Sequence, residues 1–339
     1  MMRSWGLGAL IALALAPSAW SAGWRVSTLD RTDVTLRAAA VSPDGTLHVS
    51  GSKGTYAVSR DGGVSWRRLP TPGGESYDFR GVATPDARTQ VLMSAGEAAK
   101  GLARLFRSTD GGRTWIAVHE VVEPGAFFDT IVFRDRRTGY VLGDPVDGRW
   151  FLLRTRDGGR KWVRIPGPPV APGEAAFAAS NSALFVGGRS DLWIVSGGLA
   201  KGRVHRSTDD GVTWSVSETP MVASGTAGLF GGLALGPGRA VVVGGDYKDE
   251  LRPGPGIAVT ADGAGWSLPP HAGTPRLMEG VGRLDGRTLI AVGPRGTSVS
   301  EDAGRTWRQV DDEAFHAIAC GQGTCVAAGG KGRVGVWRP

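Results

Sequence analysis

The sequence has few of the residues that most often carry metal or redox chemistry. Its 339 residues include two cysteines and five histidines, and the histidines are scattered without the spacing of metal ligands. No glycine-rich loop joins a strand pattern to a helix pattern, so nucleotide-dependent redox chemistry has no support. We therefore expect neither a metal nor a cofactor.

Long runs of one charge are also missing. The 39 Lys and Arg residues face 32 Asp and Glu, for a net charge of +7. The densest basic cluster is only Arg134, Arg136 and Arg137, whereas a nucleic-acid binder usually gathers its positive charge on one element. The interleaved charges predict a solvated surface and no nucleic-acid partner.

One apolar run stands out, and it lies at the N-terminus. Arg3 precedes twelve apolar residues, 5–16, and a segment of small residues follows, 17–22. The run is too short to span a bilayer as a helix, and the pattern is that of a signal peptide. We predict a signal peptide over 1–21, cleaved after Ser21, and a periplasmic or secreted mature chain of residues 22–339.

The two cysteines, Cys320 and Cys325, flank a short turn between two strand-like segments. In an oxidising compartment a disulfide across this hairpin is the leading hypothesis. Two free buried thiols are the alternative.

Glycine is abundant, with 54 residues, alongside 20 prolines and 12 tryptophans. Each interior glycine costs a helix about 1 kcal/mol relative to alanine, so the composition favours a turn-rich β protein. Six segments repeat a turn that ends in tryptophan, as in Ser108-Thr-Asp-Gly-Gly-Arg-Thr-Trp115, and the six tryptophans are 41 to 52 positions apart. This is the Asp-box pattern, in which the aspartate accepts backbone N–H groups within a tight turn. The aspartates of the six boxes, which we interpret as structural, are Asp61, Asp110, Asp157, Asp209, Asp262 and Asp302.

Between boxes each unit reads as three short strands, and a fourth follows the box. Four antiparallel strands in about 40–50 residues are typical of a propeller blade. The strand that begins at Trp24 has no blade before it, and three strands after residue 314 lack a fourth. We therefore predict an all-β fold, a single seven-bladed β-propeller whose N-terminal strand completes the C-terminal blade. We expect a monomer, since closure removes exposed strand edges.

Aligning the blades places one set of side chains on the face opposite the boxes. The entrances to the inner strands present Arg37, Arg80, Asp129, Glu174, Glu279 and His316. The turns between second and third strands present Lys53, Glu97, Asp144, Arg189, Asp246, Arg295 and Lys331. Charges of both signs around a mouth suit a polar partner. The predicted binding residues are Arg80, Asp129, Asp144, Glu174, Arg189, Asp246, Arg295 and His316.

The boxes, the seven units and the signal peptide together resemble the photosystem II stability/assembly factor-like Asp-box propellers. The most particular stretches are Phe128-Asp-Thr-Ile-Val-Phe133, leading to Gly139-Tyr-Val-Leu-Gly-Asp-Pro145, and Gly173-Glu-Ala-Ala-Phe-Ala-Ala-Ser180. The resemblance implies a non-enzymatic helper that binds an assembling envelope or membrane protein through an Arg-lined patch. Its candidates here are Arg37, Arg80, Arg189 and Arg295. Nothing in the chain indicates a photosynthetic host, so assembly of another envelope complex is the more general expectation.

Two alternatives remain. Sialidase-like glycoside hydrolases share the Asp-boxes, but they need an Arg triad and a Tyr nucleophile, and the last of only four tyrosines here is Tyr247. Their F/Y-R-I-P motif has only the outer-strand string Val163-Arg-Ile-Pro166 as a counterpart. We assign no catalytic residue, although paired carboxylates at the mouth would suit a glycosidic bond. A glycan-binding propeller would expose Trp150, Trp193 and Tyr247 at the mouth.

Overall fold

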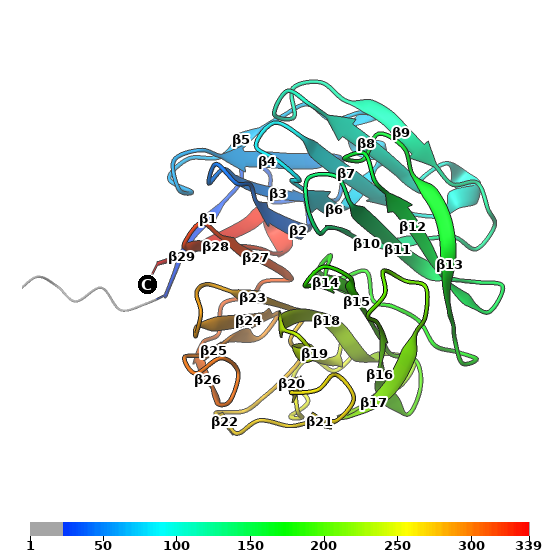
Figure 1. Ribbon diagram of the computed structural model, residues 1–339. Helices are drawn as coiled ribbons and strands as arrows, with labels where there is room; N and C mark the ends of the chain where they lie inside the picture. The colour runs from blue at the N-terminus through cyan, green and yellow to red at the C-terminus, as the bar shows by residue number, and fades with distance from the viewer. Residues whose placement is uncertain (1–22, 339) are drawn as a thin grey trace, which may run out of the picture.

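The computed structural model describes residues 23–338, which form seven sheets arranged around one centre. Figure 1 shows the chain passing round the ring once, from blue strands through green to red ones. The predicted all-β, seven-bladed propeller is confirmed, and helical structure in these residues is confined to three short 3-10 turns. Residues 1–22 and 339 lie outside the described residues, and so does the predicted signal peptide.

Each blade contributes four strands, numbered along the chain and listed here from the inner strand outward. Blades 1 to 3 are β2 to β5 (Leu36–Val41, Leu47–Gly51, Thr55–Ser59, Arg67–Arg68), β6 to β9 (Asp78–Ala83, Gln90–Ala95, Arg104–Ser108, Ile116–Glu120) and β10 to β13 (Phe128–Phe133, Gly139–Val146, Arg149–Thr155, Val163–Pro169). Blades 4 and 5 are β14 to β17 (Leu184–Gly187, Asp191–Ser196, Lys201–Ser207, Ser215–Val222) and β18 to β21 (Ala227–Gly236, Arg239–Asp246, Ile257–Thr260, Trp266–Ser267). Blade 6 is β23 to β26 (Gly280–Arg283, Leu289–Gly293, Gly296–Ser300, Trp307–Asp311), with the short β22 (His271–Ala272) added in parallel to β26.

The seventh blade joins the two ends of the described chain. Its strands are β27 (Ala317–Gly321), β28 (Thr324–Ala328), β29 (Arg333–Arg338) and the N-terminal β1 (Gly23–Thr28). β1 pairs antiparallel with β29 over six residue pairs, with Trp24 opposite Trp337. The predicted closure is therefore confirmed, and in Figure 1 the blue β1 lies beside the red β29.

The core lies between neighbouring blades rather than inside any one sheet. Tyr56 of blade 1 packs with Phe79 and Phe106 of blade 2, and Trp150 of blade 3 packs in the cluster that holds Trp193 of blade 4. Trp150 and Trp193 are both fully buried. Burying large aromatic side chains between sheets stabilises the ring, and these two indoles are therefore not the exposed platforms that a glycan-binding mouth was expected to present.

The six box turns share one hydrogen-bond pattern on one face of the ring. The Asp110 carboxylate accepts the backbone N–H of Arg113 and Thr114 and the hydroxyl of Thr114. The hydroxyl hydrogen bond from Thr114, followed by the backbone one, lowers the pKa of Asp110. Asp262, in the shorter box, accepts the N–H groups of Ala264 and Gly265. The box carboxylates thus accept hydrogen bonds from donors within their own turns.

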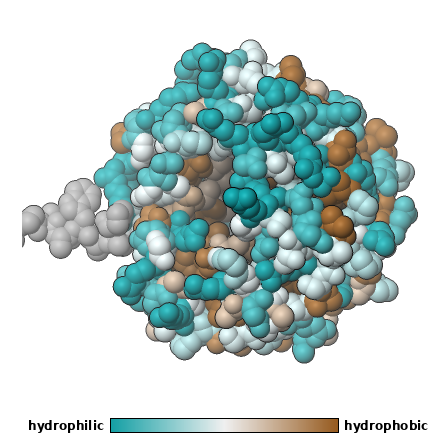
Figure 2. All heavy atoms as spheres, in the orientation of Figure 1, coloured by the Kyte–Doolittle hydropathy of each residue, from teal (hydrophilic) through white to brown (hydrophobic). Residues whose placement is uncertain are grey.

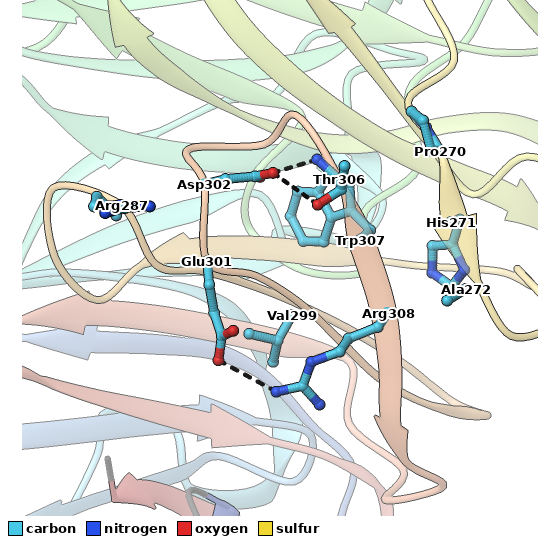
Figure 3. Close-up of a pocket in the computed structure, with 10 residues that line it drawn as sticks. All are labelled: Pro270, His271, Ala272, Arg287, Val299, Glu301, Asp302, Thr306, Trp307 and Arg308. Atoms are coloured by element: carbon cyan, nitrogen blue, oxygen red, sulfur yellow. Dashed lines mark hydrogen bonds and ion pairs between the residues drawn. The ribbon is translucent and has the colours of Figure 1, made fainter.

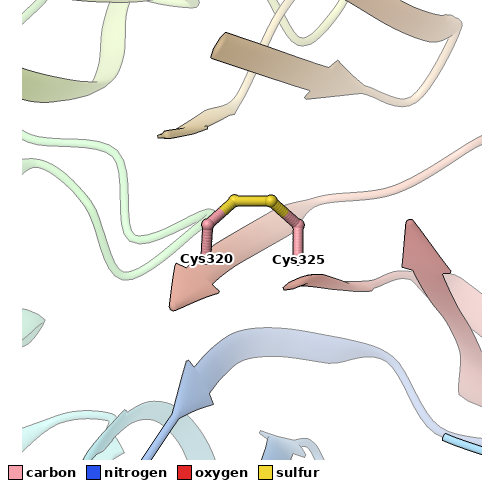
Figure 4. The surroundings of a disulfide bond; sticks show 2 residues. All are labelled: Cys320 and Cys325. Atoms are coloured by element: carbon pink, nitrogen blue, oxygen red, sulfur yellow. A yellow bond between two sulfur atoms is a disulfide. The ribbon is translucent and has the colours of Figure 1, made fainter. Parts of the chain in front are cut away.

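The hairpin of β27 and β28 pairs Cys320 with Cys325, and the structure joins their sulfurs in a disulfide (Figure 4). The bond lies in the blade that also holds the closing strand β1. Among the described residues no helix is long and apolar enough to cross a bilayer.

Candidate functional site at the propeller mouth

The inner strand of blade 4 begins later in the chain than the sequence predicts. Its inner strand is β14, which starts at Leu184, and not the apolar stretch that follows Glu174. Arg189 therefore lies in the turn between the first and second strands. The next residue, Ser190, donates its hydroxyl to Thr208 O and accepts the N–H of Asp210, both in the box turn of this blade. Arg189 is on the Asp-box face, so its predicted place at the mouth is wrong.

The residues before β14 form a segment that crosses the centre of the ring, and we call residues 171–183 the mouth segment. Arg80 of β6 donates to the carbonyl of Ala178 at 3.3 Å. Asn181 accepts the N–H of Ile131, on β10, at 2.8 Å. A Cβ built on Gly231 of β18 would lie 2.0 Å from the Ser182 hydroxyl oxygen. The segment thus contacts blades 2, 3 and 5, and it occupies the space that their inner strands enclose.

Glu174 anchors the start of the mouth segment to its own blade. Its carboxylate accepts hydrogen bonds from Ser196 at 2.7 Å and Arg203 at 2.6 Å, and it bonds His205 Nε2 at 2.7 Å. Burial alone would raise the pKa of Glu174, but the hydrogen bonds from His205 and Ser196 outweigh burial and lower it to about 2. Glu174 is therefore a buried structural anion and does not line the mouth.

The mouth segment leaves a pocket of about 440 Å³ at the propeller mouth. Its lining residues, which come from six of the blades and the mouth segment, are Arg37, Arg80, Phe127, Asp129, Asp144, Ala176, Phe177, Ala178, Ala179, Phe230, Tyr247, Glu250, Glu279 and His316. The four predicted binding residues that it brings together are Arg80, Asp129, Asp144 and His316. We call this hollow the mouth pocket.

Several charged groups of the mouth pocket are already paired. Arg80 bonds Asp78 at 2.7 Å, and His316 Nδ1 lies 2.6 Å from Glu279 Oε2. Glu250 accepts Arg295 at 3.0 Å, which places the predicted Arg295 on the rim beside the pocket. The two arginine–carboxylate pairs each cancel most of their own charge locally.

Two carboxyl groups are left over, and both have shifted pKa values. Burial, followed by the neighbouring charge of Asp144, raises the pKa of Asp129 well above its ordinary value, while Arg80 opposes the shift. Burial also raises the pKa of Asp144 to about 6, against a hydrogen bond from the Ala176 backbone. Two such carboxyls disfavour each other's charged forms. Near neutral pH the pair therefore holds less than its full negative charge.

An aromatic wall completes the pocket, and of its three residues the sequence analysis singled out only Tyr247. Phe177 of the mouth segment stacks on Phe230 of β18 with ring centroids 4.4 Å apart, and Tyr247 meets Phe177 edge-on at 5.9 Å. Tyr247 is 42% exposed, so it alone of the three expected platforms is available to a ligand. The aromatic residue in the middle of the quoted 173–180 stretch was the signal for Phe177, and Phe230 had none.

Other predicted and detected sites lie apart from the mouth pocket. Asp246 lines a neighbouring hollow of about 200 Å³ with Arg252 and Arg276. A larger hollow of about 660 Å³ lies at the outer part of blade 6 (Figure 3), where Asp302 bonds Thr306 within its box and Glu301 bonds Arg308. This outer hollow belongs to the scaffold. No cluster of three or more potential metal ligands is present in residues 23–338.

The surface in the orientation of Figure 1 is mostly hydrophilic, with a hollow near the centre of the ring (Figure 2). The lining of the mouth pocket contains two arginines against four carboxylates. A continuous Arg-lined patch is therefore not assembled at the mouth pocket.

Comparisons with known proteins support the propeller fold and do not identify a family or a function. No family model matches the sequence, and no curated protein matches it. The structure titled YCF48 bound to D1 peptide has a TM-score of 0.62 and 14% identity, over 93% of this chain and 95% of that one. An inactive virginiamycin B lyase from Staphylococcus aureus with quinupristin has a TM-score of 0.64 and 15% identity, over 94% and 99%. The GH74 enzyme of Niastella koreensis has a TM-score of 0.61 and 14% identity, over 89% of this chain and 52% of that one. Propellers of this shape thus include both a peptide binder and enzymes.

Proposed function

We propose that this chain is an exported, non-enzymatic binding scaffold whose mouth pocket receives a segment of an envelope protein. The observation that carries the proposal is the mouth segment, which fills the centre of the ring and leaves a recess of about 440 Å³. A recess of that size accepts a few side chains of a partner rather than a whole folded element. Its mixed charges and aromatic wall are the kind of surface that gives a protein contact specificity.

Two further facts support this proposal. A propeller of the same shape binds a peptide, as the YCF48 structure is titled. Arg37 lines the mouth pocket, where Glu279 acts on it only through its charge, and no hydrogen bond or ion pair of the Arg37 side chain is present among residues 23–338. An unpaired guanidinium of this kind is available to a partner's carboxylate. Export rests on the sequence pattern of residues 1–21.

The test is capture of the partner in the native cells by crosslinking of the tagged protein. Asp144→Arg reverses a charge inside the mouth pocket, and Arg189→Glu reverses one on the opposite face. We expect one envelope protein to be captured by the wild type and by Arg189→Glu, and lost in Asp144→Arg. Loss in Arg189→Glu alone would place the binding surface on the Asp-box face and contradict the proposal.

A second function, glycoside hydrolysis, is favoured by one observation, the carboxyl pair Asp129 and Asp144. A carboxyl with a raised pKa beside a second carboxyl is the arrangement that general acid catalysis uses at glycosidic bonds. The sialidase form of this chemistry is not supported, because the pocket lining includes two arginines and only one tyrosine, Tyr247. A screen of soluble glycans with wild type and Asp144→Asn tests it. Hydrolysis by the wild type that Asp144→Asn abolishes would replace the scaffold proposal.

A further inference from the structure

Asp129 is an unpaired acid in a place where acids are normally paired. Its side chain is 2% exposed, and within the described residues its Oδ2 atom has no hydrogen-bond partner. Buried polar atoms in native proteins nearly always have a partner, and leaving one without costs free energy. The unpartnered Oδ2 of Asp129, in the lining of the mouth pocket, is therefore an acceptor available to a hydrogen-bond donor of a ligand.

The backbone around Asp129 and Asp144 is irregular in both strands. The pairing of β10 with β11 shifts register between Phe128 and Thr130, which leaves Asp129 unpaired in the ladder. The pairing of β11 with β12 shifts between Gly143 and Val146, next to Asp144. Bulges of this kind re-aim side chains and are frequent beside functional sites. Both carboxyls come to line the same pocket.

The arginines near Asp129 and Asp144 do not form ion pairs with these two carboxyls. Arg80 is a cation that lowers the pKa of Asp129 against burial and the charge of Asp144, which raise it, but Arg80 is bonded to Asp78 at 2.7 Å and to the carbonyl of Ala178. Arg37 also lines the pocket, but the charged groups that act on it are Glu279, Arg80 and Asp78, and neither Asp129 nor Asp144 is among them. Within residues 23–338 neither Asp129 nor Asp144 forms an ion pair, so the negative charge of the ionised pair has no bonded cation.

The aromatic part of the pocket lining suits the same kind of ligand. The mouth pocket includes the rings of Phe177, Phe230 and Tyr247. The face of an aromatic ring attracts an ammonium or guanidinium group through the electrostatics of the ring. Carboxyls and aromatic faces together are selective for a cation with an apolar stem, and lysine and arginine side chains have both.

We infer that the partner segment carries a lysine or arginine whose charged group enters the mouth pocket and binds between Asp144 and Asp129. The inference rests on the proposed function, which supplies a protein partner. The cation supplies hydrogen-bond donors to the orphaned Oδ2 of Asp129 and relieves the repulsion between the two carboxylates. Its aliphatic stem lies against the Phe177 side of the pocket.

Capped tripeptides test the inference directly, without knowledge of the partner. Acetyl-Gly-Lys-Gly-amide, acetyl-Gly-Arg-Gly-amide and the neutral acetyl-Gly-Gln-Gly-amide are titrated by NMR into the mature chain at pH 7.5. We expect at least one cationic peptide to bind about tenfold more tightly than the glutamine peptide, with shifts confined to the mouth pocket. Equal affinities, or no binding of the cationic peptides, would overturn the inference.

Three variants locate the site. Asp144→Asn and Asp129→Asn keep the side-chain shape and should each remove the preference for the cationic peptides, while thermal unfolding confirms that both variants fold. Asp249→Asn, at an exposed position of the loop after β19, is the matched control and should keep the preference. A preference that survives both pocket variants would overturn the inference, and so would tighter binding of a glucosamine oligomer than of the lysine peptide.

The cellular capture experiment separates this inference from the proposed function. If the wild type captures an envelope protein and Asp144→Asn captures it equally well, the cation site is wrong and the scaffold proposal stands. If the wild type captures no protein, the scaffold proposal itself fails.

Discussion

The ring of Phe177 lies flat against the ring of Phe230, with centroids 4.4 Å apart and planes inclined by 11°. This contact joins the mouth segment to the inner strand of blade 5, β18. With Glu174 anchored in blade 4 and Ala178 bonded to Arg80 of blade 2, it holds the segment across the ring. The depth and the shape of the mouth pocket follow from that position.

Replacing Phe177 with alanine should therefore loosen the mouth segment. Loss of a half-buried ring and its stacked contact should lower the free energy of unfolding by about 1–3 kcal/mol. Hydrogen exchange of residues 171–183 should rise while the outer strands stay protected. Phe177→Leu, which keeps apolar volume, is the control and should cost less. Unchanged exchange in the mouth segment would show that the stacking does not hold it.

The carboxyl pair should make stability depend on pH in a specific direction. Asp144 has a pKa of about 6 in the folded chain and about 3.9 when unfolded, so the folded state binds the proton more tightly. The stability that this group contributes is complete below pH 4 and falls as pH rises to about 6. The groups that act on the pair are Arg80 and the Ala176 backbone.

Asp144→Asn should remove this decline. Denaturant unfolding at intervals from pH 4 to pH 7 measures the difference between the variant and the wild type. We expect the variant to gain stability relative to the wild type as pH rises through this window. A constant difference would mean that the pKa of Asp144 is not raised.

Glu174 should behave in the opposite sense. Its pKa of about 2 is below the unfolded value of about 4.3, so the stability it contributes is present above pH 4.3 and is lost as pH falls towards 2. Glu174→Gln leaves Arg203 and His205 without their anion and should cost about 3 kcal/mol at pH 7. Glu218→Gln, which breaks an exposed pair with Lys201, is the control and should change stability by less than about 1 kcal/mol. Equal effects of the two variants would contradict the anchor role.

The box aspartates should matter for folding and not for binding. Asp110→Ala removes the acceptor of two N–H groups and of the hydroxyls of Ser108 and Thr114, so the melting temperature should fall. Capture of the partner, measured at a temperature where the variant is folded, should equal that of the wild type. Lost capture by a folded Asp110→Ala protein would give the boxes a binding role that this account does not.

The repeating turns explain why the sequence predicts the architecture well. Each box uses an aspartate, a left-handed backbone position and a tryptophan at fixed spacing, and all three are visible without a structure. The pairing of β1 with β29 was predictable because unmatched strands remained at both ends. These features depend on short-range chemistry and on counting.

The inner strand of blade 4 was predicted wrongly because the apolar residues 175–180 belong to the mouth segment and not to a strand. Residues 175–180 have the length and the polarity of a strand, but they pack in the centre of the ring, where Ala175 makes a single bridge to Gly197. Periodicity alone cannot separate the two cases. Because the inner strand begins at Leu184, the residues expected to form the turn between the second and third strands form the end of β14. Arg189 consequently lies on the Asp-box face.

The candidate site was predicted in part for a similar reason. Asp129 and Asp144 were expected on one face, and they lie on adjacent strands, but their mutual effect depends on two bulges that no pattern reveals. Trp150 and Trp193 were expected to be exposed to a ligand, but neighbouring blades cover both faces of each sheet. A strand covered on both faces lacks the alternation of polar and apolar residues that would show which side chains are exposed.

The central claim is that the mouth face, and not the Asp-box face, binds a protein segment. A photo-crosslinking amino acid at Tyr247, beside the mouth pocket, and one at Val212, an exposed box residue, test it in the native cells. The account predicts a specific crosslinked envelope protein from position 247, absent when Asp144→Arg is added, and none from position 212. The same crosslinked protein from position 212, with none from position 247, would contradict it.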